Sequence, residues 1–199
     1  MININIKSIL VALTALSISA CSSTAYHVNA INGQTLKGEN KISLNDSNFY
    51  LVNGGDGRMM SFTSLGESDE KAEGSGISAL NIASDSLSKF TQLIVVENNE
   101  LTEDKALDVA KTNNNDYLIY SRVEQWSDPL GINCGTHYYD EASVLLSIYS
   151  VKDRKLINTS RLAAKSCPTK LNGFPLSPGS PENLYSDLFS KWVNENFNI

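Results

Sequence analysis

The spacing of apolar residues switches between extended and helical periods along the central part of the chain. Uninterrupted β-prone runs at Phe49–Val52, Leu93–Val96 and Tyr117–Tyr120 predict three strands. Between these runs, apolar residues recur at intervals of three or four, which predicts amphipathic helices from Ile77 to Phe90 and from Glu103 to Ala110. The third run has the composition of a strand that is covered on both faces.

The last third of the chain predicts a hairpin followed by a helix. Apolar residues alternate with serine from Ala142 to Ile148, and Lys152–Lys155 then turns the chain into a second strand, Leu156–Ser166. Ser180–Glu182 is a typical helix start, with a capping serine, a proline and an acid. We therefore expect an α/β (α+β) fold, a single compact domain with a mixed sheet of about four to five strands and about three helices, in the order β-α-β-α-β-β-β-α.

Two polar stretches lack any periodicity. Residues 22–46 are rich in Asn, Ser, Gly and Lys, which predicts a tether that leads into the domain. Residues 58–73 predict a solvated loop, because they end in an acidic cluster that does not match a calcium-binding loop. The cluster consists of Glu67, Asp69, Glu70 and Glu73.

The N-terminus has the layout of a secretory signal. Lys7 precedes an uncharged apolar run that is too short to span a membrane, and the run ends at Ile18–Cys21, which resembles the lipobox of bacterial lipoproteins. We expect cleavage before Cys21 and its acylation, with palmitate among the acyl groups. The alternative is an ordinary signal peptide that leaves Cys21 an incidental thiol. In enteric-type lipoproteins the next residue steers sorting, and Ser22, not being Asp, implies the outer membrane.

These signals divide the chain into a signal peptide at 1–20, a lipidated N-terminus and tether at 21–46, and one α/β domain at 47–199, with the domain facing the periplasm or the cell surface. Removing the leader takes away Lys7 and no acid, so 15 basic against 22 acidic residues leave a net charge of −7. A surface of this charge argues against nucleic acid and against broad contact with anionic lipid.

The two remaining cysteines, Cys134 and Cys167, form an even pair in an oxidising compartment, which predicts a disulfide. The hairpin supports this pairing because it brings Cys167 near Asp140, a short loop away from Cys134. The bridge would close a loop of about 34 residues and stabilise by roughly 3–4 kcal/mol. A metal site and a catalytic thiol stay open as alternatives, with His27 and His137 as the available imidazoles. We expect no metal and no cofactor.

Two further groups are candidate binding residues. Gly74, Ser75 and Gly76 precede a predicted helix and can present N–H groups to an anion, although a simple helix-entry turn capped by Ser75 is the favoured explanation. The segment lacks the lysine of a phosphate-binding loop and the nucleophile elbow of a hydrolase. His137, Tyr138 and Tyr139 lie in the loop between the expected bridge and the hairpin and predict a partner contact, or else a cover for the open end of the hairpin.

The order of these elements resembles the bacterial lipoprotein family called domain of unknown function 4823. The similar pieces are Leu51-Val52 with Asp56-Gly57, Gly74–Gly76, Asp116–Tyr120, Trp126 and Ser166. Ser121 stands where the family tends to have proline, and the Cys134 loop replaces a charged stretch. The resemblance implies the fold and the anchor and leaves the activity open.

Two functions are consistent with the sequence. The first is a non-catalytic outer-membrane lipoprotein that binds or assembles with another component of the cell envelope, held to the lipid bilayer through Cys21. The alternative is a periplasmic hydrolase-type enzyme with a carboxylate site that the sequence does not reveal. The lack of a recognisable catalytic set favours the first.

Overall fold

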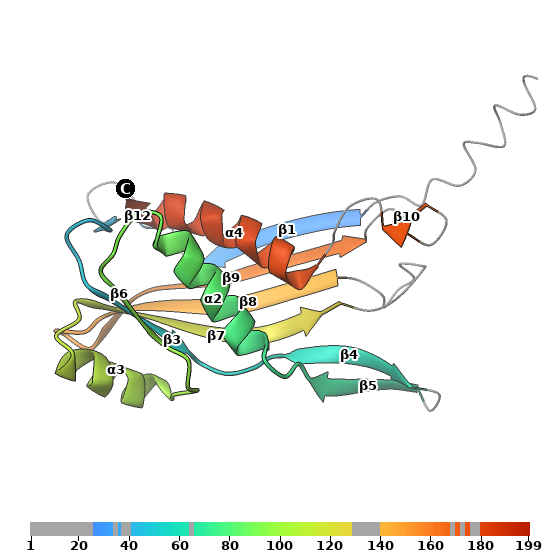
Figure 1. Cartoon of the computed structure of the whole chain (residues 1–199), viewed down its shortest axis with the longest axis horizontal. Coiled ribbons are helices and arrows are strands. Elements are labelled where there is room, and N and C mark those ends of the chain that lie inside the picture. Colours follow the sequence, from blue (N-terminus) through green and yellow to red (C-terminus); the bar gives the residue numbers. More distant parts are fainter. Residues whose placement is uncertain are drawn as a thin grey trace, which may run out of the picture.

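The computed structural model describes residues 26–33, 36, 41–63, 66–128, 140–167, 170–171, 174–175 and 180–199. These residues form an eight-stranded mixed sheet with helices packed on both of its faces (Figure 1). The α+β class predicted from the sequence is confirmed, although the sheet has more strands than expected.

The main path of the sheet runs in the order β1-β9-β8-β7-β3-β6. Strand β3, next to the β6 end, is parallel to both of its neighbours, β6 and β7, whereas β7, β8, β9 and β1 pair antiparallel. All five residues of β3 are buried, as expected for a parallel strand covered on both faces. The bounds are β1 (Tyr26–Gly33), β3 (Phe49–Asn53), β6 (Ile94–Glu97), β7 (Tyr117–Ser127), β8 (Asp140–Ser150) and β9 (Lys155–Cys167).

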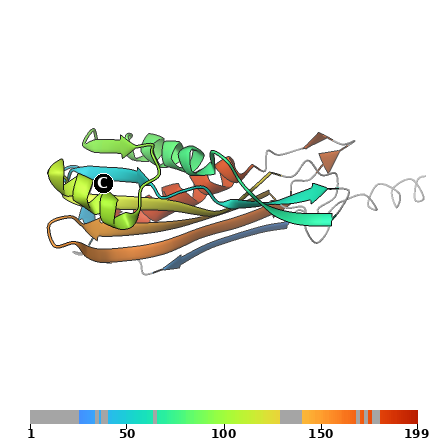
Figure 2. The ribbon, with the colours of Figure 1, turned by 90° about the horizontal axis from the view of Figure 1, so that it is seen from below.

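Helices α2 (Ser75–Leu87) and α4 (Pro181–Asn196) cover one face of the sheet, and α3 (Glu103–Thr112) covers one end of the other (Figure 2). The larger core lies under α2 and α4 and contains the fully buried Trp192 and Phe189. Complete burial of an aromatic side chain stabilises the fold by about 1.5–3 kcal/mol. The smaller core joins α3 to β3 and β7 through residues such as Leu107 and Leu118.

Helix α4 is fixed at both ends by polar contacts. Its start is the predicted one, because the Oγ of Ser180 accepts a hydrogen bond of 3.3 Å from the N–H of Asn183. Near its end, the buried Asn196 accepts a bond of 2.7 Å from the side chain of Asn158 on β9. A buried amide pair of this kind holds the helix in register on the sheet.

The stretch expected as a solvated loop is a β-hairpin. Strands β4 (Arg58–Thr63) and β5 (Gly66–Lys71) pair along their whole length. The strand pairing between β4 and β7 is limited to one position, Arg58 opposite Gln125. The hairpin is therefore an arm that extends past the end of β7 (Figure 1). One acidic residue of the arm is paired across the two strands, Asp69 with Arg58 at 2.6 Å, which offsets part of the charge.

Part of the expected tether also belongs to the sheet. Strand β1 pairs with β9 from Tyr26 opposite Cys167 to Gly33 opposite Ser160. An edge strand tolerates polar residues, so the hydrophobic pattern of the sequence did not indicate β1. Four two-residue strands complete the fold, with β12 (Phe197–Asn198) parallel to β2 (Ile42–Ser43) and β10 (Lys170–Leu171) antiparallel to β11 (Phe174–Pro175).

Candidate functional site

The most organised polar site in the described residues is the β3–α2 junction, which we define as the loop Asn53–Gly57 together with Gly74–Gly76 at the start of α2. The Asp56 carboxylate accepts hydrogen bonds from the N–H groups of Gly76 at 2.8 Å and Gly74 at 3.2 Å. A carboxylate at a helix N-terminus satisfies N–H groups that have no partner within the helix. The anion at this helix start is therefore a side chain of the chain itself.

Ser75 does not cap α2, contrary to the sequence-based expectation. The cap position is Gly74, which has a left-handed backbone with φ of 81°. The Ser75 Oγ instead accepts a hydrogen bond of 3.0 Å from the N–H of Gly57 and is buried. Ser75 thus ties the helix to the loop after β3.

Asn53 connects the junction to the loop that follows β6. Its Oδ1 accepts a bond of 2.9 Å from the N–H of Gly55, and its Nδ2 donates to the carbonyl of Asn98 at 3.0 Å. The side chain is 5% exposed. Close by, the hydroxyl of Tyr120 donates to the carbonyl of Leu101 at 2.8 Å. These bonds hold three loops together.

The charge of Asp56 is stabilised by its surroundings. Burial alone would raise the pKa of its carboxyl, but the hydrogen bonds from Gly76 and Gly74 and the ammonium group of Lys71 at 3.3 Å outweigh burial and lower the pKa. Sequence reasoning identified Asp56 as part of a turn and missed this role. Nothing local in the sequence signals it, because the helix that Asp56 caps begins about twenty residues later.

The other predicted site residues gather at one end of the molecule or lie outside the described residues. Cys167 ends β9 opposite Tyr26, and the preceding Ser166 lies opposite Asp140, as the hairpin argument expected. Cys21, Cys134, His137, Tyr138 and Tyr139 lie outside the described residues, so the acylation, the disulfide and the partner contact stay predictions. Strand β1, which follows Cys21 in the sequence, begins at the same end of the sheet at which β9 ends with Cys167.

Among the residues that the structure describes, no group of three or more His, Cys, Asp or Glu side chains is placed to hold a metal ion. None of the helices in the same part of the chain has the length and hydrophobicity of a membrane-spanning segment.

Residues 59–195 match the family model described as Domain of unknown function (DUF4823). The chain belongs to this family. The match includes the β4–β5 arm, both helices that cover the larger core, and the long antiparallel strands. No curated protein resembles this DUF4823 chain in sequence.

Comparison with solved structures found similar chains. The chain is similar to PelC of Paraburkholderia phytofirmans, solved as a dodecamer, with a TM-score of 0.56 and 14% identity over 86% of this chain and 100% of PelC. The C-terminal domain of LpoB from Salmonella enterica aligns with a TM-score of 0.34 and 16% identity over 60% of this chain and 83% of that domain. The likeness to PelC shows that the DUF4823 domain has a fold found in that protein.

Proposed function

We propose that this DUF4823 protein is an outer-membrane lipoprotein that works by assembly in the cell envelope, with copies of itself and with further envelope proteins, and not by catalysis. The observation that carries the proposal is the fold match to PelC, which covers the whole of a protein that was solved as a dodecamer. The β3–α2 junction supports a non-catalytic role, since its polar groups bind one another.

The anchor part of the proposal rests on Cys21 and its distance from the first strand. Strand β1 begins at Tyr26, five residues after Cys21. Five extended residues span at most about 17–18 Å, so an acylated Cys21 would hold the domain close to the bilayer. The start of β1 and the end of β9 would then face the membrane, and the turn between β8 and β9 would point away from it.

Fractionation and crosslinking of intact cells test the proposal. The wild-type chain is expected in the outer-membrane fraction, labelled by a palmitate analogue and crosslinked into species larger than one chain. Cys21→Ala should lose the label and leave the membrane fraction, and Ser22→Asp should keep the label but move to the inner membrane. Unchanged labelling of Cys21→Ala would refute the anchor.

A further inference from the structure

Strand β6 ends the sheet and has a free edge. Its strand neighbour is β3, with pairs from Phe49 opposite Ile94 to Val52 opposite Glu97, and no other described strand pairs with it. At the opposite end of the sheet, β1 pairs with β9 alone among the described strands. The main path of the sheet therefore has two open ends, which are formed by different strands (Figures 1 and 2).

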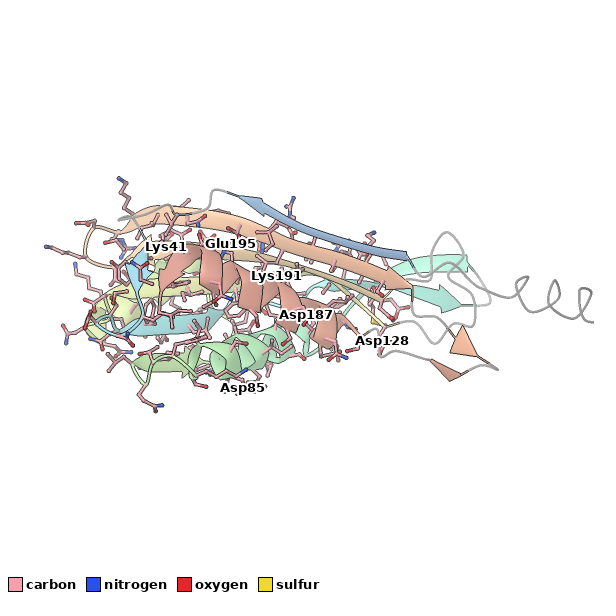
Figure 3. The ribbon with its side chains drawn as sticks, turned by 90° about the horizontal axis from the view of Figure 1, so that it is seen from above. Lys41, Asp85, Asp128, Asp187, Lys191 and Glu195 are labelled. Carbon is pink, nitrogen blue, oxygen red and sulfur yellow. The ribbon has the colours of Figure 1, made fainter. Side chains whose placement is uncertain are left out.

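The β6 edge is unusually apolar for a surface. Leu93 is 43% exposed, Val95 is 47% exposed and Val96 is 36% exposed. These three account for half of the six exposed large hydrophobic residues in the described part of the chain. By contrast, the outer surface of the helical layer carries charged side chains, among them Asp85 on α2 and Lys191 on α4 (Figure 3).

The edge also lacks the usual protection against strand pairing. Natural edge strands carry lysine, proline or a bulge that keeps another strand away. Strand β6 has the sequence Ile-Val-Val-Glu, and its single charge is already engaged. The Glu97 carboxylate accepts hydrogen bonds from the Tyr50 hydroxyl at 3.4 Å and from the N–H of Asn99 at 2.9 Å.

We propose that the β6 edge pairs with the β1 edge of a second copy, so that the sheet continues from one copy into the next. This inference rests on the self-assembly in the proposed function and names the surface that performs it. A strand added to an exposed edge gains main-chain hydrogen bonds, and the apolar side chains of β6 lose their contact with water.

Strand direction fits this pairing. Strand β6 runs parallel to β3 and β7, and three successive antiparallel pairings from β7 through β8 and β9 make β1 run opposite to β6. Copies anchored in one membrane through Cys21 have the same end toward it. The β1 strand of a neighbour is then antiparallel to β6, and a tight antiparallel ladder can form.

The pairing of two different edges also fits an assembly of many copies. A contact between unlike surfaces is head-to-tail, and its repetition closes a ring when the rotation between copies divides a full turn. Pairing of β6 with β6 would use the edge of both partners and stop at a dimer. The β6–β1 contact leaves one free edge at each end of a growing assembly.

Val95→Lys is the direct test, and Leu156→Lys is its matched control. Leu156 is 46% exposed, like Val95, but lies on β9, where it pairs with Tyr149 of β8 and belongs to neither the β6 nor the β1 edge. The mass of the full lipidated chain in detergent is measured by light scattering over a concentration series. We expect several chains for the wild type and for Leu156→Lys, and association at least tenfold weaker for Val95→Lys, since a charge in the strand interface costs about 1.4 kcal/mol or more.

A photocrosslinker at position 95 of the full chain gives a second readout that does not depend on weakening the contact. We expect crosslinks from position 95 to peptides from Tyr26–Gly33 of another copy. A photocrosslinker at position 156 should give no crosslinks to these peptides. If the wild type and Val95→Lys assemble equally, or the crosslinks map elsewhere, the β6–β1 contact is wrong while self-assembly stands. If the wild type stays a single chain at every concentration, self-assembly itself fails.

Discussion

The Oδ1 of Asp56 accepts a hydrogen bond of 2.8 Å from the backbone N–H of Gly76, although twenty positions separate the two residues in the sequence. Between them lies the β4–β5 arm, which leaves the sheet after Gly57 and returns to it before Gly74. The bond therefore closes the base of the arm and fixes the start of α2. The bond thus links the β4–β5 arm to helix α2, which packs on the larger core.

Asp56→Asn should destabilise the fold by about 1–2 kcal/mol at pH 7, because the charge that offsets the helix dipole and pairs with Lys71 is lost. The folded-state pKa of Asp56 is lowered, so its contribution is fully present above the pKa of an unfolded Asp, about 3.9, and is lost as the pH falls through the folded pKa. The difference in free energy of unfolding between wild type and variant should therefore become smaller in acid. Urea unfolding at pH 7 and pH 3 measures it, with the exposed Asp85→Asn as control; a gap independent of pH would contradict the assignment.

Gly76→Ala and Gly74→Ala should separate crowding from backbone strain. A Cβ at Gly76 would collide with the Asn53 side chain and lie 3.0 Å from the carbonyl oxygen of Gly55, so we expect a loss of about 2–3 kcal/mol. A Cβ at Gly74 meets nothing within 4 Å, and only its φ of 81° disfavours alanine, by about 1–2 kcal/mol. Denaturant midpoints compare the two variants. Similar losses would mean that Asn53 moves aside without cost.

A disulfide between Cys134 and Cys167 stays a prediction, and mass mapping of the mature protein under non-reducing conditions tests it. Cys167 ends β9, next to the pair of Ser166 and Asp140, where β8 begins. Replacing both cysteines with serine should lower the free energy of unfolding by about 3–4 kcal/mol. Two free thiols in freshly purified protein would show that the pairing is wrong.

Tyr138 and Tyr139 are predicted to contact a partner protein in the envelope. Side chains held by a nearby bridge lose little entropy on binding, so replacing both with alanine should weaken crosslinking to partners and leave the thermal midpoint nearly unchanged. A collapse of the midpoint would instead show that the tyrosines belong to the core. Unchanged crosslinking in a folded variant would place the contact elsewhere.

The elements with a regular apolar pattern were predictable from sequence, and those without one were not. Strand β7, the β8–β9 hairpin and helix α4 with its Ser180 cap follow the predicted pattern, because burial forces apolar residues into a helical or extended period. The β4–β5 arm and β1 lie at the margins of the sheet. Their sequences carry no such pattern, and their pairing depends on residues far away in the chain.

The candidate site shows the same division. Gly74–Gly76 was correctly placed at a helix start, but the cap comes from Asp56, across the arm, and Ser75 bonds to Gly57. The apolar run Leu93–Val96 predicted a strand, and only the sheet order shows that this strand is an edge with Val95 exposed. Position in the sheet is a tertiary property, which local composition does not encode.

The mass of the wild-type lipoprotein, extracted from membranes in mild detergent and measured by light scattering, tests the central claim most directly. Assembly through unlike edges predicts a defined species of several chains that persists on dilution well below the concentration of the extract. A mass of one chain at all concentrations, in protein that is folded and acylated at Cys21, would contradict the proposal that this DUF4823 protein works by self-assembly.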